Sequence, residues 1–232
     1  MIAIVKKWLR RVRRLSQVSL AVLAVNASPV IATAEVNAPV RILALGDSLT
    51  AGYGLARAEA FPVKLQAALN RQGVVAEVVN GGVSGDTSTG GVGRLAWLLG
   101  SDPASAFDAV IIELGANDGL RGLDPADTER NLAALIRTAE QRGLLVLLTG
   151  MLAPPNLGAE YGKQFNGLYP RLADAHGVAF YPFFLEGVAA RPELNLTDAL
   201  HPNAAGVDVI VENILPLVRN LLAEVKKQRK AD

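Results

Sequence analysis

The junction between an apolar run and a small polar turn constrains this chain more than any other stretch. Residues 40–45 are apolar apart from Arg41, and they are followed by Gly46, Asp47 and Ser48. Near-continuous apolar character is typical of a strand buried on both faces of a parallel sheet. Because open α/β sheets bind ligands at the carboxyl ends of their strands, Ser48 is a candidate nucleophile. The same Gly-Asp-Ser composition is also common in ordinary turns and helix caps.

Further apolar runs alternate with segments of helical periodicity along the rest of the chain. This alternation predicts one α/β domain in which helices cover both faces of a parallel sheet. The segment 151–158 contains adjacent prolines, so we expect a surface loop there. The expected strands are 40–46, 74–80, 109–114, 144–150 and 178–181, and the expected helices are 61–71, one ending near 100, 124–143, 161–176 and 203–227.

The first 34 residues have the composition of an export signal. Six Lys and Arg residues precede an apolar core at 18–25, and Ala32-Thr33-Ala34 offers small residues for cleavage. We therefore expect a signal peptide at 1–34, one folded domain at 35–232, and a protein in the periplasm or outside the cell. An uncleaved membrane anchor is the competing interpretation, but the apolar core is short and interrupted, so we expect no stable membrane insertion once the signal is removed.

Charge and cysteine content exclude several classes of function. Residues 35–232 carry 17 Lys and Arg against 22 Asp and Glu, so the domain is acidic and lacks the basic surface of a nucleic-acid-binding protein. The chain has no cysteine, which excludes disulfides, a thiol nucleophile and a thiolate metal site. Two histidines are too few for a histidine-rich metal centre. We expect no metal and no cofactor, and nothing in the sequence indicates an oligomeric state.

A base and a carboxylate for the candidate serine occur far downstream. A serine hydroxyl needs a base within hydrogen-bond reach, usually a histidine that a carboxylate holds in the useful tautomer. Asp198 lies three residues before His201, and the order Ser, Asp, His is one that serine hydrolases use. The other histidine, His176, lies beside Gly177 at the end of an expected helix, where an imidazole has a structural role.

Acyl transfer also requires donors for the oxygen that gains charge in the tetrahedral intermediate. The candidates are the Ser48 amide, the Gly85 amide and the side-chain amide of Asn117. Gly85 lets the backbone approach a reacting centre closely, although a simple turn also uses glycine. Asn117 follows an apolar run and supplies N–H donors that aspartate lacks, although it also suits a loop cap. The adjacent Asp47, Asp86 and Asp118 are expected to bond loop amides.

Apolar side chains lie beside these polar motifs in two loops. We expect Leu120, Leu123 and Pro154 to border a groove for an acyl chain. The alternative is that the leucines only anchor their loop.

These motifs occur in the order found in a known family. The chain resembles the SGNH (GDSL) hydrolases, and within them the bacterial multifunctional acyl-CoA thioesterase I, lysophospholipase and arylesterase group. The resemblance rests on Gly46-Asp47-Ser48-Leu49, Ser84-Gly85-Asp86-Thr87-Ser88, Glu113 to Gly122 and Asp198-Ala199-Leu200-His201-Pro202.

The resemblance implies a three-layer α/β/α, flavodoxin-like fold with a five-stranded parallel sheet. It implies a serine esterase or thioesterase whose small substrates are aryl esters, acyl-CoA-type thioesters or lysophospholipids. It assigns catalysis to Ser48, Asp198 and His201, and the oxyanion hole to Ser48, Gly85 and Asn117. An acetylesterase acting on carbohydrate or cell-envelope polymer, and a non-catalytic binding module on the same scaffold, are the alternatives.

Overall fold

Five parallel strands form one sheet with the order β2-β1-β3-β4-β5. The computed structural model describes residues 38–100 and 106–231, all within a unit spanning 35–232. The predicted signal segment, residues 1–34, lies outside the described residues. The strands are β1 (Val40–Gly46), β2 (Ala76–Gly82), β3 (Ala109–Glu113), β4 (Leu145–Thr149) and β5 (Ala179–Tyr181).

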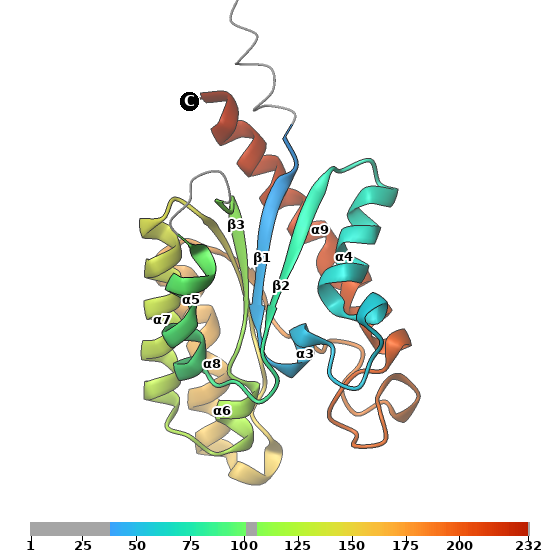
Figure 1. Cartoon of the computed structure of the whole chain (residues 1–232). Helices are drawn as coiled ribbons and strands as arrows, with labels where there is room; N and C mark the ends of the chain where they lie inside the picture. Colours follow the sequence, from blue (N-terminus) through green and yellow to red (C-terminus); the bar gives the residue numbers. More distant parts are fainter. Residues whose placement is uncertain (1–37, 101–105, 232) are drawn as a thin grey trace, which may run out of the picture. The chain divides into compact units, whose positions relative to one another are not determined.

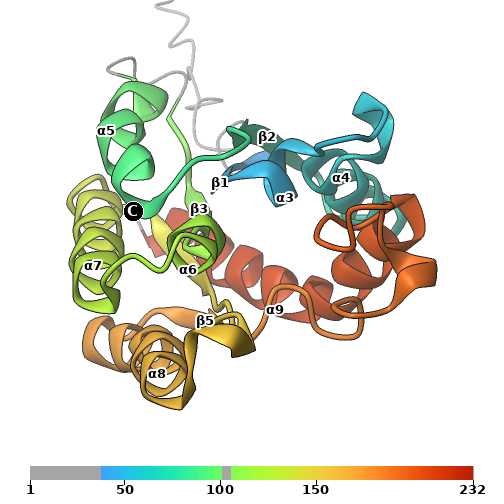
Figure 2. The same ribbon diagram turned by 90° about the horizontal axis from the view of Figure 1, so that it is seen from below.

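Helices cover both faces of this sheet, which confirms the three-layer α/β/α expectation. One face carries α4 (Phe61–Arg71) and α9 (Ala204–Ala231), and the other carries α5 (Ser88–Leu99), α7 (Pro125–Gln141) and α8 (Ala159–His176) (Figure 1). Seen along the strands from their carboxyl ends, the short helices α3 (Ser48–Ala51) and α6 (Ala116–Leu120) lie in front of the sheet (Figure 2). Short 3-10 helices span Arg57–Glu59, Pro155–Leu157 and Pro192–Leu194.

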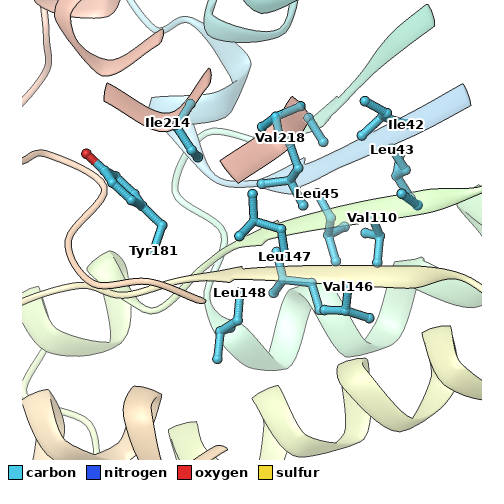
Figure 3. Packing of buried hydrophobic residues seen from close by; sticks show 14 of the residues in the cluster. Ile42, Leu43, Leu45, Val110, Val146, Leu147, Leu148, Tyr181, Ile214 and Val218 are labelled. Carbon is cyan, nitrogen blue, oxygen red and sulfur yellow. The ribbon is translucent and has the colours of Figure 1, made fainter. Parts of the chain in front are cut away.

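The sheet is buried because both of its faces are apolar. Every residue of β3 is buried, and β1 is buried apart from Arg41, as the continuous apolar runs predict. Leu147 points towards Ile214 and Val218 of α9, whereas Val146 and Leu148 point to the opposite face (Figure 3). Among the described residues, no helix combines the length and the hydropathy that a bilayer-spanning segment needs.

The strand order places the predicted site. The connection after β1 leads to β2 on one side, and the connection after β3 leads to β4 on the other, so the chain leaves the carboxyl ends of these adjacent strands in opposite directions. Gly46 is in register with Gly82 of β2 and with Glu113 of β3. The segments that follow these three strands therefore meet at one edge of the sheet.

Most element boundaries agree with the sequence, and the differences have local causes. Strand β2 begins at Ala76 rather than at residue 74, because the Val74 amide donates to the Leu69 carbonyl and completes the end of α4. Helix α5 begins at Ser88, with Thr87 as its cap, although three of its residues are glycines that weaken a helical pattern. Helix α9 continues through Pro216 to Ala231.

The amino end of the sheet is tied to the carboxyl end of α9 by one guanidinium group. Nη2 of Arg229 lies 2.7 Å from both carboxylate oxygens of Asp108. The same side chain donates to the carbonyls of Ala38 and Pro39 at 2.9 and 3.4 Å. The Asp108 carboxylate also accepts from the Arg41 amide of β1 at 2.7 Å. This ion pair therefore joins the last helix to the starts of β1 and β3.

We predict that Arg229→Met lowers the free energy of unfolding by about 1–3 kcal/mol, because charge-assisted hydrogen bonds are lost and a largely buried carboxylate keeps fewer partners. Urea unfolding measures the change. Arg171→Met is the matched control, since Arg171 pairs with Glu129 at the surface and exposed pairs contribute less than about 1 kcal/mol. Equal losses in the two variants would contradict the prediction.

Candidate active site

The candidate nucleophile lies in the turn between β1 and α3. The Asp47 side chain caps α3 by accepting from the Leu49 amide at 3.0 Å. A Cβ atom on Gly46 would lie 2.0 Å from Oγ1 of Thr50, so only glycine permits this close turn. Ser48 lies at the carboxyl end of β1 and is 8% exposed, so it is almost fully buried. The turn that the sequence predicts is therefore present.

The structure brings Ser48, His201 and Asp198 together. Oγ of Ser48 lies 2.9 Å from Nε2 of His201, although the two residues are 153 positions apart. Nδ1 of His201 lies 2.6 Å from Oδ2 of Asp198. The imidazole thus bridges a hydroxyl and a carboxylate, which is the arrangement of a serine nucleophile with its base and orienting group.

Backbone amides fix the carboxylate of this set. Oδ1 of Asp198 accepts from the His201 and Leu200 amides at 3.0 and 2.9 Å. These two bonds, with the bond to the His201 ring, lower the pKa of Asp198 to about 2. Ala199 adopts a left-handed conformation with φ of 57°, which closes the turn between the carboxylate and the ring. The carboxylate is therefore ionised and aimed at Nδ1.

An aromatic ring lies against the histidine, and the sequence did not indicate this contact. The ring centroids of Tyr53 and His201 are 4.5 Å apart, with planes tilted by 37°. Tyr53 is half exposed and follows α3 closely in the chain. No motif spacing reveals such a contact, because it depends on how the loop before α9 folds back over α3.

Of the candidate oxyanion donors, the Asn117 side chain contacts the turn that carries Ser48 and the loop that carries Gly85. Nδ2 of Asn117 lies 2.9 Å from the Asp86 carbonyl and 3.0 Å from Oδ2 of Asp47. A side-chain amide has two N–H donors. Both N–H groups of Asn117 therefore already have an acceptor in the free protein. Gly85 has φ of 82°, and its carbonyl accepts from Arg121 at 2.8 Å. An oxyanion would have to share or displace one acceptor of Asn117.

Two buried carboxyl groups lie beneath the nucleophile. Burial is the largest influence on Asp47 and raises its pKa to about 6, against the bonds from Leu49 and Asn117. Burial also raises the pKa of Glu113 well above its ordinary value, and the nearby Asp47 charge adds to the effect. Oε2 of Glu113 accepts from the Thr50 hydroxyl at 2.8 Å, whereas Oε1 has no hydrogen-bond partner among the described residues. The protonated form of Glu113 is therefore favoured.

The three aspartates beside the motifs differ in their partners. Asp47 and Asp118 bond loop amides as expected, since Asp118 accepts from the Ser88 amide at 2.9 Å. The expectation for Asp86 is wrong. Its carboxylate instead accepts from Arg94 at 2.6 Å, because the guanidinium reaches it from α5.

The residues predicted to border an acyl groove lie on neighbouring segments. Leu120 ends α6, Leu123 follows it, and both side chains are exposed. A Cβ atom on Gly119 would lie 3.5 Å from Cδ of Pro154, which places the Pro154 loop beside α6. Tyr161 of α8 donates to the Leu123 carbonyl at 2.8 Å.

The second histidine, His176, lies elsewhere. Its Nδ1 is 3.4 Å from Glu140, and it does not approach Ser48.

No cluster of three or more His, Cys, Asp or Glu residues that could hold a metal ion occurs within 38–100 and 106–231. The groups gathered at the sheet edge are instead a hydroxyl, an imidazole, a carboxylate and amide donors. Acyl transfer through an activated hydroxyl requires groups of these kinds.

Comparison with known proteins identifies the family. Residues 44–209 match the GDSL-like lipase/acylhydrolase family. The chain is 40% identical to Esterase TesA of Pseudomonas aeruginosa over 181 residues, which is 78% of this chain and 89% of that protein. It is 36% identical to Thioesterase 1/protease 1/lysophospholipase L1 of Escherichia coli strain K12 over 183 residues, 77% of this chain and 85% of that protein.

A solved structure agrees with these relatives. The SGNH-hydrolase family esterase AlinE4 is 45% identical and superposes with a TM-score of 0.67, covering 80% of this chain and 97% of that one. The chain therefore belongs to the GDSL-like lipase/acylhydrolase family, as the motif order indicates. It is a carboxylic ester hydrolase of the GDSL esterase and thioesterase type.

The buried acid yields a test by pH. A group whose pKa is raised on folding stabilises the folded state below its unfolded pKa, and this stability is lost as pH rises through the folded pKa. We predict that the free energy of unfolding of Glu113→Gln, relative to the parent, increases between pH 5 and pH 8, because glutamine has no proton to lose.

Urea unfolding of both proteins at the two pH values measures this difference. Glu129→Gln is the control, because Glu129 lies at the surface in a pair with Arg171. A difference between Glu113→Gln and the parent that stays constant with pH would show that Glu113 titrates alike in the folded and unfolded chains.

Proposed function

We propose that the chain is an exported serine esterase and thioesterase in which Ser48, His201 and Asp198 form the catalytic triad. The observation that carries the proposal is the 2.9 Å contact between Oγ of Ser48 and Nε2 of His201, backed by Asp198 at 2.6 Å. A hydroxyl becomes an effective nucleophile only when a base can take its proton as it attacks. These three residues meet that requirement.

In the first half of the reaction, Oγ of Ser48 attacks the carbonyl carbon of an ester or thioester while Nε2 of His201 takes the hydroxyl proton. The carbonyl oxygen gains a negative charge in the tetrahedral intermediate. When this intermediate collapses, His201 gives the proton to the leaving alcohol or thiol, and the acyl group remains on Ser48. Asp198 stabilises the imidazolium and holds its orientation throughout.

The oxyanion is bound by the Ser48 and Gly85 amides and by the side chain of Asn117. In the free protein the Asn117 amide donates to the Asp86 carbonyl and to Asp47. We propose that the Asn117 N–H that donates to the Asp86 carbonyl turns to the oxyanion, because a charged oxygen attracts a donor more strongly than a neutral carbonyl oxygen does. The bond to Asp47 then keeps the amide aimed at the site.

In the second half, His201 takes a proton from water, which attacks the acyl carbon and regenerates Ser48 by the reverse sequence of proton transfers. No step requires a metal or an organic cofactor. His201 therefore acts as the general base and as the general acid in both halves of the reaction.

Small acyl esters and thioesters are the proposed substrates. Leu120, Leu123 and Pro154 form the border of the acyl groove. Leu120 and Leu123 are exposed and follow Asn117 closely in the chain, and Pro154 lies against Gly119. The names of the relatives, Esterase TesA and Thioesterase 1/protease 1/lysophospholipase L1, support aryl esters, acyl-CoA-type thioesters and lysophospholipids. The substrates involve no nucleic acid.

Export is proposed from the sequence of residues 1–34, in which six cationic residues precede an apolar core and a small-residue cleavage site. The hydrolase domain then spans 35–232 and works in the periplasm or outside the cell. The absence of cysteine lets this domain fold without disulfide formation there.

We predict that Ser48→Ala lowers kcat/KM by about 1,000-fold or more for an aryl acetate, an acyl-CoA thioester and a lysophospholipid alike, because one nucleophile serves all three. Steady-state rates measure the loss. Thr138→Ala is the control, since its hydroxyl on α7 donates to the Ala134 carbonyl and lies away from the site. A Ser48→Ala protein as fast as the parent would refute the proposed nucleophile.

The same assays separate the substrate classes. The parent enzyme is expected to hydrolyse the aryl acetate and the thioester faster than an acetylated sugar. The opposite preference would replace the proposed substrates with those of a carbohydrate acetylesterase.

A further inference from the structure

One guanidinium group joins three segments that lie close to Ser48. Arg94 lies on α5, and its side chain is 18% exposed. It donates to the carbonyl of Gly46 at 2.7 Å and to the carbonyl of Gly81. Its Nε lies 2.6 Å from Oδ2 of Asp86. The group therefore joins the ends of β1 and β2 to the loop that follows β2.

The residues that Arg94 contacts are next to the proposed oxyanion donors in the chain or bonded to them. Gly46 comes two residues before Ser48, and Asp86 follows Gly85 in the chain. The Asp86 carbonyl also accepts from Asn117 at 2.9 Å. Arg94 thus contacts neither the nucleophile nor the substrate position, yet each proposed donor is one short link away from it.

The chemistry of the group suits a link of this kind. Guanidinium is planar, always charged, and directs its N–H donors along several fixed directions, whereas an ammonium group is a compact charge on a flexible stem. The Asp86 side chain is only 13% exposed, so the pair is largely shielded from solvent. A Cβ atom on Gly90 would lie 1.6 Å from Oδ1 of Asp86, so the carboxylate needs glycine at that position of α5.

We propose that Arg94 is a positioning residue for the oxyanion hole, fixing the Asp86 loop, and through it Gly85 and Asn117, relative to Ser48. The inference rests on the proposed function, which places the oxyanion among these three residues. In that mechanism the Asn117 amide leaves the Asp86 carbonyl as the tetrahedral intermediate forms. Arg94 binds the Asp86 carboxylate and thereby keeps the Asp86 backbone carbonyl in place. The Asn117 amide then has one alternative acceptor and returns to it after each turnover.

The proposal affects the transition state more than the bound substrate. Weakening a donor that contacts the oxyanion only in the tetrahedral state lowers kcat. Weakening a contact that is equally strong in the bound substrate and in the transition state raises KM instead. Losing one oxyanion donor costs about 100- to 1,000-fold in kcat, and misplacing one costs less. We therefore expect Arg94→Met to lower kcat on an aryl acetate by about 10- to 100-fold, with KM within about twofold of the parent.

Arg229→Met is the matched control. Arg229 makes the same kind of contact set, one aspartate and two backbone carbonyls, but at the opposite end of the sheet from Ser48. Arg229→Met is expected to lose stability and to keep the parent kcat. A general loosening of the fold would lower kcat in both variants alike, whereas loss of positioning lowers it only in Arg94→Met.

Two further measurements keep the test decisive if Arg94→Met folds poorly. Arg94→Lys keeps the charge but not the planar donors, so its kcat is expected to stay at least about fivefold below the parent. Arg94→Ala is expected to regain part of its kcat when methylguanidinium is added, whereas methylammonium at the same concentration restores none. If Arg94→Ala were impaired only by a general structural defect, methylguanidinium and methylammonium would have the same effect on its kcat.

Parent kcat in Arg94→Lys, or an equal fall in Arg94→Met and Arg229→Met, would overturn the positioning role. The proposed function fails separately. It fails if Ser48→Ala retains parent activity, whatever the Arg94 variants do. An inactive Ser48→Ala combined with fully active Arg94 variants overturns the positioning role alone.

Discussion

The hydrogen bond between Ser48 and His201 is the contact on which the site depends, because it joins two ends of the described chain. Ser48 follows the first strand, and His201 precedes the last helix. Their approach is set by the packing of α4 against α9. Lys64 of α4 donates to the Ala204 carbonyl at 2.8 Å and pairs with Asp208 at 2.7 Å, which fixes the beginning of α9. Sheet order places the serine, and helix packing places the histidine.

The groups behind this contact handle charge in two different ways. Asp198 is held ionised by backbone amides, and its pKa falls to about 2. Beneath the serine, burial drives the pKa values of Asp47 and Glu113 upward, which favours a proton on Glu113. A neutral acid there supports the Thr50 hydroxyl without adding a second buried charge beside Asp47. The site thus keeps one anion next to the imidazole and limits negative charge beneath the Ser48 turn.

The sequence predicted the five strands and both helical layers, because their apolar runs are long and their turns carry Gly and Pro. It also indicated Ser48, Asn117 and His201, since each lies directly after a strand or beside a helix start. It did not indicate the contact of Tyr53 with His201 or the pairing of Asp86 with Arg94. Both depend on how loops fold back over the sheet edge, and neither leaves a periodic pattern or a fixed spacing.

Covalent trapping tests the central assignment most directly. The protein is treated with a p-nitrophenyl alkylphosphonate, and the adduct is located by intact-mass and peptide mass spectrometry. The account predicts one phosphonyl group per chain, on Ser48, formed rapidly in the parent and at least about 100-fold more slowly in a folded His201→Gln variant. An adduct on another residue, or equal rates in the two proteins, would contradict the role of this serine and its histidine.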